Sequence, residues 1–193
     1  MRIHHTSPRK LPSLLVALLC ITVSAAEASG QCEVTPIPVG DGSTSSFNTQ
    51  VDLDGDIAVI GDLSDDRLGS YSGSVKVRRF NGTVWVEEAV LTASNGGAQD
   101  QFGTQVAVSG NVIAVGSAPW QLPDNPGAAY IFRYNIAASI WEEEAILTRQ
   151  TPAPTVSKNF FGVNIALDRD VVVIAGTTIN GTGEDIMGAH IFR

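Results

Sequence analysis

Residues 101–147 read QFGTQVAVSGNVIAVGSAPWQLPDNPGAAYIFRYNIAASIWEEEAIL, and parts of this pattern recur before and after it along the chain. Phe47, Phe102 and Phe161 each head one copy, at spacings of 55 and 59 residues. An apolar run that leads to a glycine follows each phenylalanine, and then come a loop and a short strand-like segment. A period of this length predicts a fold that is built by repeating one structural unit.

The first half of each copy predicts a tight β-hairpin. The apolar runs VDLDGDIAVI (51–60) and VAVSGNVIAV (106–115) are interrupted by DG at 54–55 and by SGN at 109–111. Such residues suit a two-residue turn, because its central positions take positive φ. In the third copy DRD at 168–170 fills this place less well.

The second half of a copy predicts two more strands. The segment AAYIF at 128–132 makes the third strand, and EEEAIL at 142–147 supplies the fourth. Only residues 141–147 have apolar spacing that would also suit a helix, and we interpret them as a strand with a charged start. Four antiparallel strands per copy are typical of a propeller blade, whereas helical solenoids have shorter repeats. The expected fold is therefore all-β, with propeller-type blades.

Taken together, these motifs resemble the FG-GAP type of β-propeller repeat, in the bacterial secreted variety that ends in WxxxAxL. The ending is matched by Trp141, Ala145 and Leu147. The opening FG stands at 102–103 and again at 161–162, whereas the first copy has FN at 47–48. The resemblance covers residues 47–193. It implies blades like those of the integrin α-subunit head, and it implies interaction rather than catalysis, without naming a ligand.

Residues 1–30 are expected to be a secretory signal peptide. Three basic residues lie within the first ten, residues 11–23 form a short apolar core, and small residues follow as far as Gly30. This core is shorter than the roughly 20 residues that span a bilayer, which favours cleavage over anchoring. We expect a secreted protein, extracellular or on the cell surface, with no membrane span after cleavage. The cleavage position stays open.

The rest of the chain divides into an N-terminal segment, residues 31–46, and repeats at 47–101, 102–160 and 161–193. The last repeat is incomplete, and three blades are fewer than the usual roughly four to eight. We therefore expect a partial or truncated propeller, whose third blade a strand at 33–37 could complete. An uncovered blade face would favour self-association.

Acidic residues outnumber basic ones. The formal net charge is −8, and removing residues 1–30 takes away three basic residues and one acidic residue, which leaves −10. A surface of this sign repels phosphate, which argues against nucleic acid and against anionic membranes as partners. The residues after 30 contain one cysteine, Cys32. Once residues 1–30 are removed, we therefore expect no disulfide bond within residues 31–193.

The acidic residues of the first copy raise the question of calcium binding. Residues 52–56 (DLDGD) resemble the acidic loops that bind calcium in many FG-GAP repeats, and Asp54, Asp56 and Asp62 offer the hard oxygen atoms that calcium prefers. The loop is shorter than those loops, however, and the second copy has SGN at 109–111 in the matching place. We interpret the aspartates as turn formers and expect no cofactor, with calcium as the disfavoured alternative.

Catalytic motifs are scarce. No serine nucleophile elbow, CxxC, HExxH or phosphate loop occurs in the sequence. His190 matches Tyr130 of the second copy, which predicts an ordinary strand residue. The acidic pairs at 87–88 and 142–144 recur at equivalent positions, which favours exposed surface charges over an acid and base pair. We expect no enzymatic activity.

Tryptophan supplies the one candidate for ligand contact. Trp85 and Trp141 are equivalent in the repeat and are predicted to pack between blades. Trp120 has no counterpart and lies in the proline-rich loop 117–126. A tryptophan in a loop on a rigid scaffold can anchor a protein surface or a sugar, although it could also simply cover the edge of the blade.

Two functional classes remain open from the sequence. The first is a secreted, non-catalytic module that binds an unidentified protein or a component of the cell surface. The second is an extracellular propeller that binds or acts on carbohydrate, which would need an aromatic platform or a converging pair of carboxylates. The sequence supports the first class more strongly, because neither feature can be assembled from it.

Overall fold

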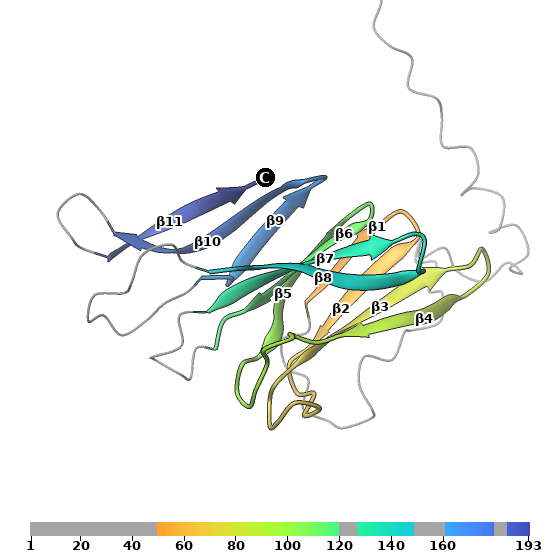
Figure 1. Cartoon of the computed structure of the whole chain (residues 1–193), viewed down its shortest axis with the longest axis horizontal. Coiled ribbons are helices and arrows are strands. Elements are labelled where there is room, and N and C mark those ends of the chain that lie inside the picture. Colours follow the sequence, from red (N-terminus) through yellow and green to blue (C-terminus); the bar gives the residue numbers. More distant parts are fainter. Residues whose placement is uncertain (1–49, 120–126, 149–160, 180–184) are drawn as a thin grey trace, which may run out of the picture. The chain divides into compact units, whose positions relative to one another are not determined.

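The computed structural model describes residues 50–119, 127–148, 161–179 and 185–193, all within one compact unit, Ile37–Arg193. The predicted signal peptide, the segment 31–46, the FN dipeptide at 47–48 and Trp120 lie outside the described residues. The described part contains strands without helices, and the strands form three antiparallel sheets (Figure 1).

The sheets follow the order of the copies along the chain. The first consists of β1 (Val51–Asp54), β2 (Ile57–Asp62), β3 (Ser74–Phe80) and β4 (Trp85–Leu91). The second consists of β5 (Phe102–Ser109), β6 (Val112–Ser117), β7 (Ala128–Asn135) and β8 (Ile140–Leu147). The third contains β9 (Asn164–Asp168), β10 (Val171–Ile179) and β11 (Asp185–Phe192). This confirms the expected all-β fold of propeller-type blades, and the described strands make up a partial propeller.

Each sheet opens with the expected hairpin. The first residue of the turn is Gly55 in the first sheet, Gly110 in the second and Arg169 in the third. Their φ values are 60°, 56° and 54°, respectively. Glycine reaches this left-handed region without steric cost, whereas a residue with a Cβ is uncommon there. Arg169 thus adopts the same turn as the two glycines, which explains why the third hairpin is harder to recognise in the sequence.

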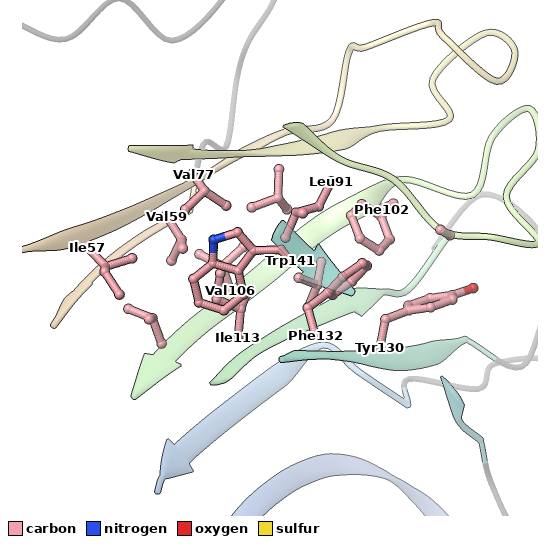
Figure 2. Packing of buried hydrophobic residues seen from close by; sticks show 14 residues of the cluster. Ile57, Val59, Val77, Leu91, Phe102, Val106, Ile113, Tyr130, Phe132 and Trp141 are labelled. Carbon is pink, nitrogen blue, oxygen red and sulfur yellow. The ribbon is translucent and has the colours of Figure 1, made fainter. Parts of the chain in front are cut away.

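The largest buried cluster fills the space between the first two sheets (Figure 2). The first sheet contributes Ile57, Val59 and Val77, and the second contributes residues such as Ile113 and Trp141. A second cluster joins the other face of the second sheet to the third. The second sheet is therefore covered on both faces, which is why every residue of β6 is buried instead of every other one.

The phenylalanine of each FG dipeptide lies in one of these clusters. Phe102 packs edge-on against Tyr130 and Phe132, with ring centroids 5.2 and 6.1 Å apart. Phe161 makes the same pair of contacts with His190 and Phe192, at 5.2 and 6.3 Å. His190 thus takes the place of Tyr130, as the sequence predicted, and edge-on aromatic contacts of this kind add to the stability that burial provides.

The glycine of the FG dipeptide brings two backbones into contact. A methyl group on Gly61 of β2 would overlap the carbonyl oxygen of Gly103 in the next sheet. The same overlap would occur between Gly116 of β6 and Gly162 at the start of the third sheet. The sheets can approach this closely only where both partners lack a side chain, so each of these contacts fixes the position of one sheet on the next.

Replacing Gly61 by alanine tests this contact. We expect Gly61→Ala to lower the free energy of unfolding by roughly 3 kcal/mol, because the added methyl group must push two sheets apart. Gly55→Ala is the matched control, because Gly55 has positive φ but a methyl group added to it would meet nothing within 4 Å. It should cost roughly 1 kcal/mol through backbone strain alone. Urea denaturation measures both, and equal costs for the two variants would contradict the contact.

Candidate functional site

The aspartates of the first hairpin bond to the second sheet. The backbone N–H of Val108 donates to Oδ2 of Asp52 at 2.8 Å, and that of Gly110 donates to Oδ2 of Asp54 at 2.6 Å. Hydrogen bonds to a carboxylate are stronger than those between neutral groups. Two of the carboxylates that resemble calcium ligands therefore act as acceptors between neighbouring blades.

A similar contact joins the second and third sheets. Ser109 stands at the repeat position of Asp54, and its Oγ accepts a hydrogen bond from the backbone N–H of Arg169 at 3.0 Å. Arg169 in turn stands at the position of Gly110. The residue before each of these turns thus supplies an oxygen atom to the next hairpin, and the exchange of aspartate for serine keeps the bond while removing the charge.

A network around Glu88 forms the second junction between the first two sheets. Arg79 donates to both carboxylate oxygens of Glu88, at 2.7 and 3.1 Å. The indole Nε1 of Trp141 donates to Oε2 of the same carboxylate at 3.0 Å. The Arg79 guanidinium also lies over the ring of Tyr134, 5.4 Å from its centroid. The hydrogen bond with Glu88 raises the pKa of Arg79, against the opposing effect of burial.

The interpretation of Glu88 as an exposed surface charge was therefore wrong. The register between β3 and β4 shifts between Val77 and Arg78, so that Glu87 pairs with Arg78 and Ala89 pairs with Val77. Glu88 is the extra residue, and its side chain is only 18% exposed. A bulge of this kind redirects one side chain, which simple alternation along the strand cannot predict.

The segment after β4 also contacts the second sheet through polar groups. Glu143 accepts hydrogen bonds from the backbone N–H and the hydroxyl group of Ser94, at 2.9 and 2.6 Å. Tyr130 donates to Oδ1 of Asn95 at 2.9 Å. Burial, together with the negative charges of Asp100 and Glu143, raises the pKa of Tyr130 to about 12, against the opposing effect of the hydrogen bond with Asn95. Glu143, like Glu88, is thus a contact between blades.

The acidic loop between β2 and β3 uses its carboxylates locally. Asp62 pairs with Lys76 at 3.3 Å, and Asp65 pairs with Arg67 at 3.0 Å while accepting a hydrogen bond from Ser74 Oγ at 2.8 Å. These contacts hold the loop in shape. Among the described residues, no three His, Cys, Asp or Glu side chains gather into a group that could hold a metal ion.

The aromatic candidates have different surroundings. Trp141 is buried between the first two sheets, as predicted, whereas its repeat equivalent Trp85 packs against Phe80 of its own sheet at 5.4 Å. Trp120, the candidate anchor for a ligand, lies outside the described residues. Nε2 of His190 is buried and has no hydrogen-bond partner within the described ranges.

Two grooves open beside these junctions. One, of about 380 Å³, lies at the hairpin end of the first two sheets and is lined by Asp56, Arg79, Asn111, Tyr134 and Ile136, among others. The other, of about 320 Å³, lies between β8 and the third sheet. The first groove combines charge, an aromatic ring and an exposed aliphatic side chain, a mixture that suits contact with a protein surface.

Comparison with known families agrees with this architecture. The family model of the FG-GAP repeat matches residues 85–132. The chain contains an FG-GAP repeat. The match starts at Trp85, where β4 begins, and ends at Phe132 within β7. The FG-GAP repeat as matched thus joins the last strand of one blade to the first three strands of the next.

No curated protein matches the chain. In the ranges that the structure describes, no helix is long and apolar enough to cross a membrane.

Removing the carboxylate of Glu88 tests the junction around it. We expect Glu88→Ala to lower the free energy of unfolding by roughly 2 kcal/mol, because Arg79 and the buried indole of Trp141 both lose a charged acceptor. Glu87→Ala is the matched control, because the Glu87 side chain is 46% exposed and forms an ion pair with Arg78 at 3.3 Å. Its cost should stay below about 1 kcal/mol. Chemical denaturation followed by tryptophan fluorescence compares the two, and equal losses would contradict this role of Glu88.

The hairpin aspartates lead to a second prediction. Because the carboxylates of Asp52 and Asp54 already accept hydrogen bonds from the second sheet, we expect the melting temperature to be the same in excess calcium and in excess chelator. A ligand that binds the folded state would raise the melting temperature. A rise with calcium that disappears in Asp54→Ala would instead identify the hairpin as a metal site.

Proposed function

We propose that this FG-GAP chain is a secreted, non-catalytic module that binds a protein or another component of the cell surface. Export is supported by the signal-like pattern of residues 1–30. The module would act outside the cell, as a rigid scaffold that presents loops and turns to a partner. Such a role needs neither a catalytic group nor a cofactor. It needs a surface that a partner can contact.

The observation that carries the proposal is the groove at the hairpin end of the first two sheets. Both blades contribute to it, and Arg79 and Tyr134 line it beside the carboxylate of Asp56. Ile136, in the turn after β7, is 77% exposed at its rim. Arginine and tyrosine are enriched where proteins bind one another, and an exposed aliphatic side chain beside them adds apolar area for a partner to cover.

The use of the carboxylates supports a role without catalysis. Asp52, Asp54 and Glu88 accept hydrogen bonds from the second sheet, and Glu143 accepts them from the segment that follows the first sheet. A general acid or base must be within hydrogen-bonding reach of a substrate. Carboxylates that hold the blades together in this way have a structural role. We therefore propose that the function of the chain is to bind a partner.

Capture from cell-envelope extracts tests the proposal. The chain should retain a defined envelope protein, and Ile136→Glu should reduce retention by roughly tenfold, because it places a charge at the apolar rim of the groove. Val84→Glu is the matched control. Val84 stands in the corresponding turn of the first sheet and is 56% exposed, but it does not line the groove.

A glycan array run with the same two variants separates the carbohydrate alternative. Saturable binding of a saccharide that Ile136→Glu weakens would overturn the protein-binding role in favour of a lectin-like one. Equal retention of the envelope protein by both variants would show that the groove is not the contact surface.

A further inference from the structure

The dipeptide Asn-Gly occurs at 81–82, 95–96 and 180–181. In such a pair the backbone nitrogen of the glycine can attack the side-chain amide of the asparagine, because glycine has no side chain that hinders the approach. The first two pairs lie in the described part of the chain, and the third lies outside it. The structure surrounds the first two differently, although their sequences are alike.

The first pair lies in the turn between β3 and β4 (Figure 1). Residues 81–84 are all exposed, and a methyl group on Gly82 would meet nothing within 4 Å. The backbone N–H of Asn81 donates to the carbonyl oxygen of Val84 at 3.1 Å, which closes the turn. The N–H of Gly82 donates to no group in the part of the chain that the structure describes. The nitrogen that would attack is therefore accessible to a base in the solvent.

The side-chain carbonyl group of Asn81 is polarised by the same turn. Its Oδ1 accepts hydrogen bonds from the backbone N–H groups of Thr83 and Val84, both at 3.0 Å. When a nitrogen attacks the amide carbon, negative charge develops on this oxygen. Donors already aimed at an oxygen that gains charge stabilise the transition state, as they do in the oxyanion hole of an enzyme. The turn thus supplies both an accessible nitrogen and an activated carbonyl group.

The second pair has a polarised carbonyl group but no accessible nitrogen. Oδ1 of Asn95 accepts a hydrogen bond from the hydroxyl group of Tyr130 at 2.9 Å. The backbone N–H of Gly96, however, donates to the carbonyl oxygen of Ala93 at 3.1 Å. Gly96 is also closely packed, because a methyl group on it would lie 3.0 Å from Cδ1 of Leu68. For its nitrogen to attack, the segment must break a hydrogen bond and leave this packing.

We propose that Asn81 deamidates spontaneously in the folded protein, whereas the fold protects Asn95. A base in the solvent removes the proton from the backbone nitrogen of Gly82, and the electron pair left on this nitrogen forms a bond to Cγ of Asn81. The bond between Cγ and Nδ2 then breaks, and Nδ2 takes a proton from water and leaves as ammonia. The product of this step is a cyclic imide.

Water then opens the imide in one of two ways. Addition at Cγ breaks the newly formed bond and gives aspartate at position 81, whereas addition at the main-chain carbonyl breaks the original peptide bond and gives isoaspartate. Either product carries a negative charge that Asn81 lacks. The neighbouring Phe80 donates its backbone N–H to the carbonyl oxygen of Asp56 at 2.8 Å, and Asp56 lines the groove at the hairpin end. The reaction thus changes the charge beside that groove, and it needs only water and a base.

Mass spectrometry of the full chain, incubated at neutral and at mildly alkaline pH, tests the site. Digestion with trypsin and with a protease that cleaves after glutamate places Asn81 and Asn95 in separate peptides, because Glu87 and Glu88 lie between them. In the folded chain Asn81 should convert roughly tenfold faster than Asn95, because release of the Gly96 nitrogen costs a hydrogen bond. Conversion at Asn81 should be faster at the higher pH, because the attacking nitrogen must first lose its proton.

The unfolded chain is the matched control for the two sites. In concentrated guanidinium chloride the turn around Asn81 and the packing around Gly96 are both lost, so the difference in rate between Asn81 and Asn95 should disappear. Equal rates in the folded chain would overturn the proposal, because the fold would then protect neither site. A difference that persists unchanged in the denaturant would overturn it as well, because local sequence rather than the fold would then select the site.

A substitution in the turn identifies the attacking group. Gly82→Ala should slow conversion at Asn81 roughly tenfold, because a methyl group beside the nitrogen hinders its approach. Gly55→Ala is the matched control: Gly55 also has positive φ and open surroundings, but it does not follow an asparagine. Conversion at Asn81 should stay unchanged in this control, and circular dichroism checks that both variants are folded. Equal rates at Asn81 in the two variants would show that the nitrogen of Gly82 is not the attacking group.

Discussion

The contact between glycine backbones of neighbouring sheets is the constraint on which the rest of the structure depends. Where Gly61 meets Gly103, and where Gly116 meets Gly162, no room remains for a Cβ atom. This close approach places Phe102 and Phe161 in the apolar layers between the sheets, and it brings each hairpin within hydrogen-bonding distance of the next. Packing then follows, because two apolar faces held this close exclude water.

Polar groups between the sheets add a second set of contacts to those made by the glycines. Asp54 and Ser109 accept hydrogen bonds from the next hairpin, and Glu88 and Glu143 bind groups across the first junction. From the sequence, the aspartate is interpreted as a turn former and the glutamates as exposed surface charges, with a metal site and an acid and base pair as the disfavoured alternatives. Their hydrogen bonds to backbone and indole N–H groups show that they specify how one blade sits on another, a task that apolar contact alone performs less selectively because it has no preferred direction.

Much of the fold could be predicted from the sequence, because its main signals are local. The DG and SGN turns, the alternation of apolar residues in the first sheet and the recurrence of FG each act within a few residues of chain. Glu88 could not be placed in this way, since a bulge in β4 turns it toward the second sheet. The groove beside Glu144 was also missed, because residues from two sheets, Leu147 of β8 and Val172 of β10 among them, line it and meet only in the folded chain.

The sequence by itself determined the strands, the hairpins, the period of the repeat and the aromatic residues that fill the layers, because these depend on the backbone preferences and hydrophobicity of nearby residues. Only the tertiary structure decided what the carboxylates do. Whether Asp54 coordinates an ion or accepts a hydrogen bond depends on which group lies opposite it, and that group, the N–H of Gly110, is 56 residues away along the chain. The same holds for Trp141 and Glu88, which are 53 residues apart and meet only because two blades are stacked.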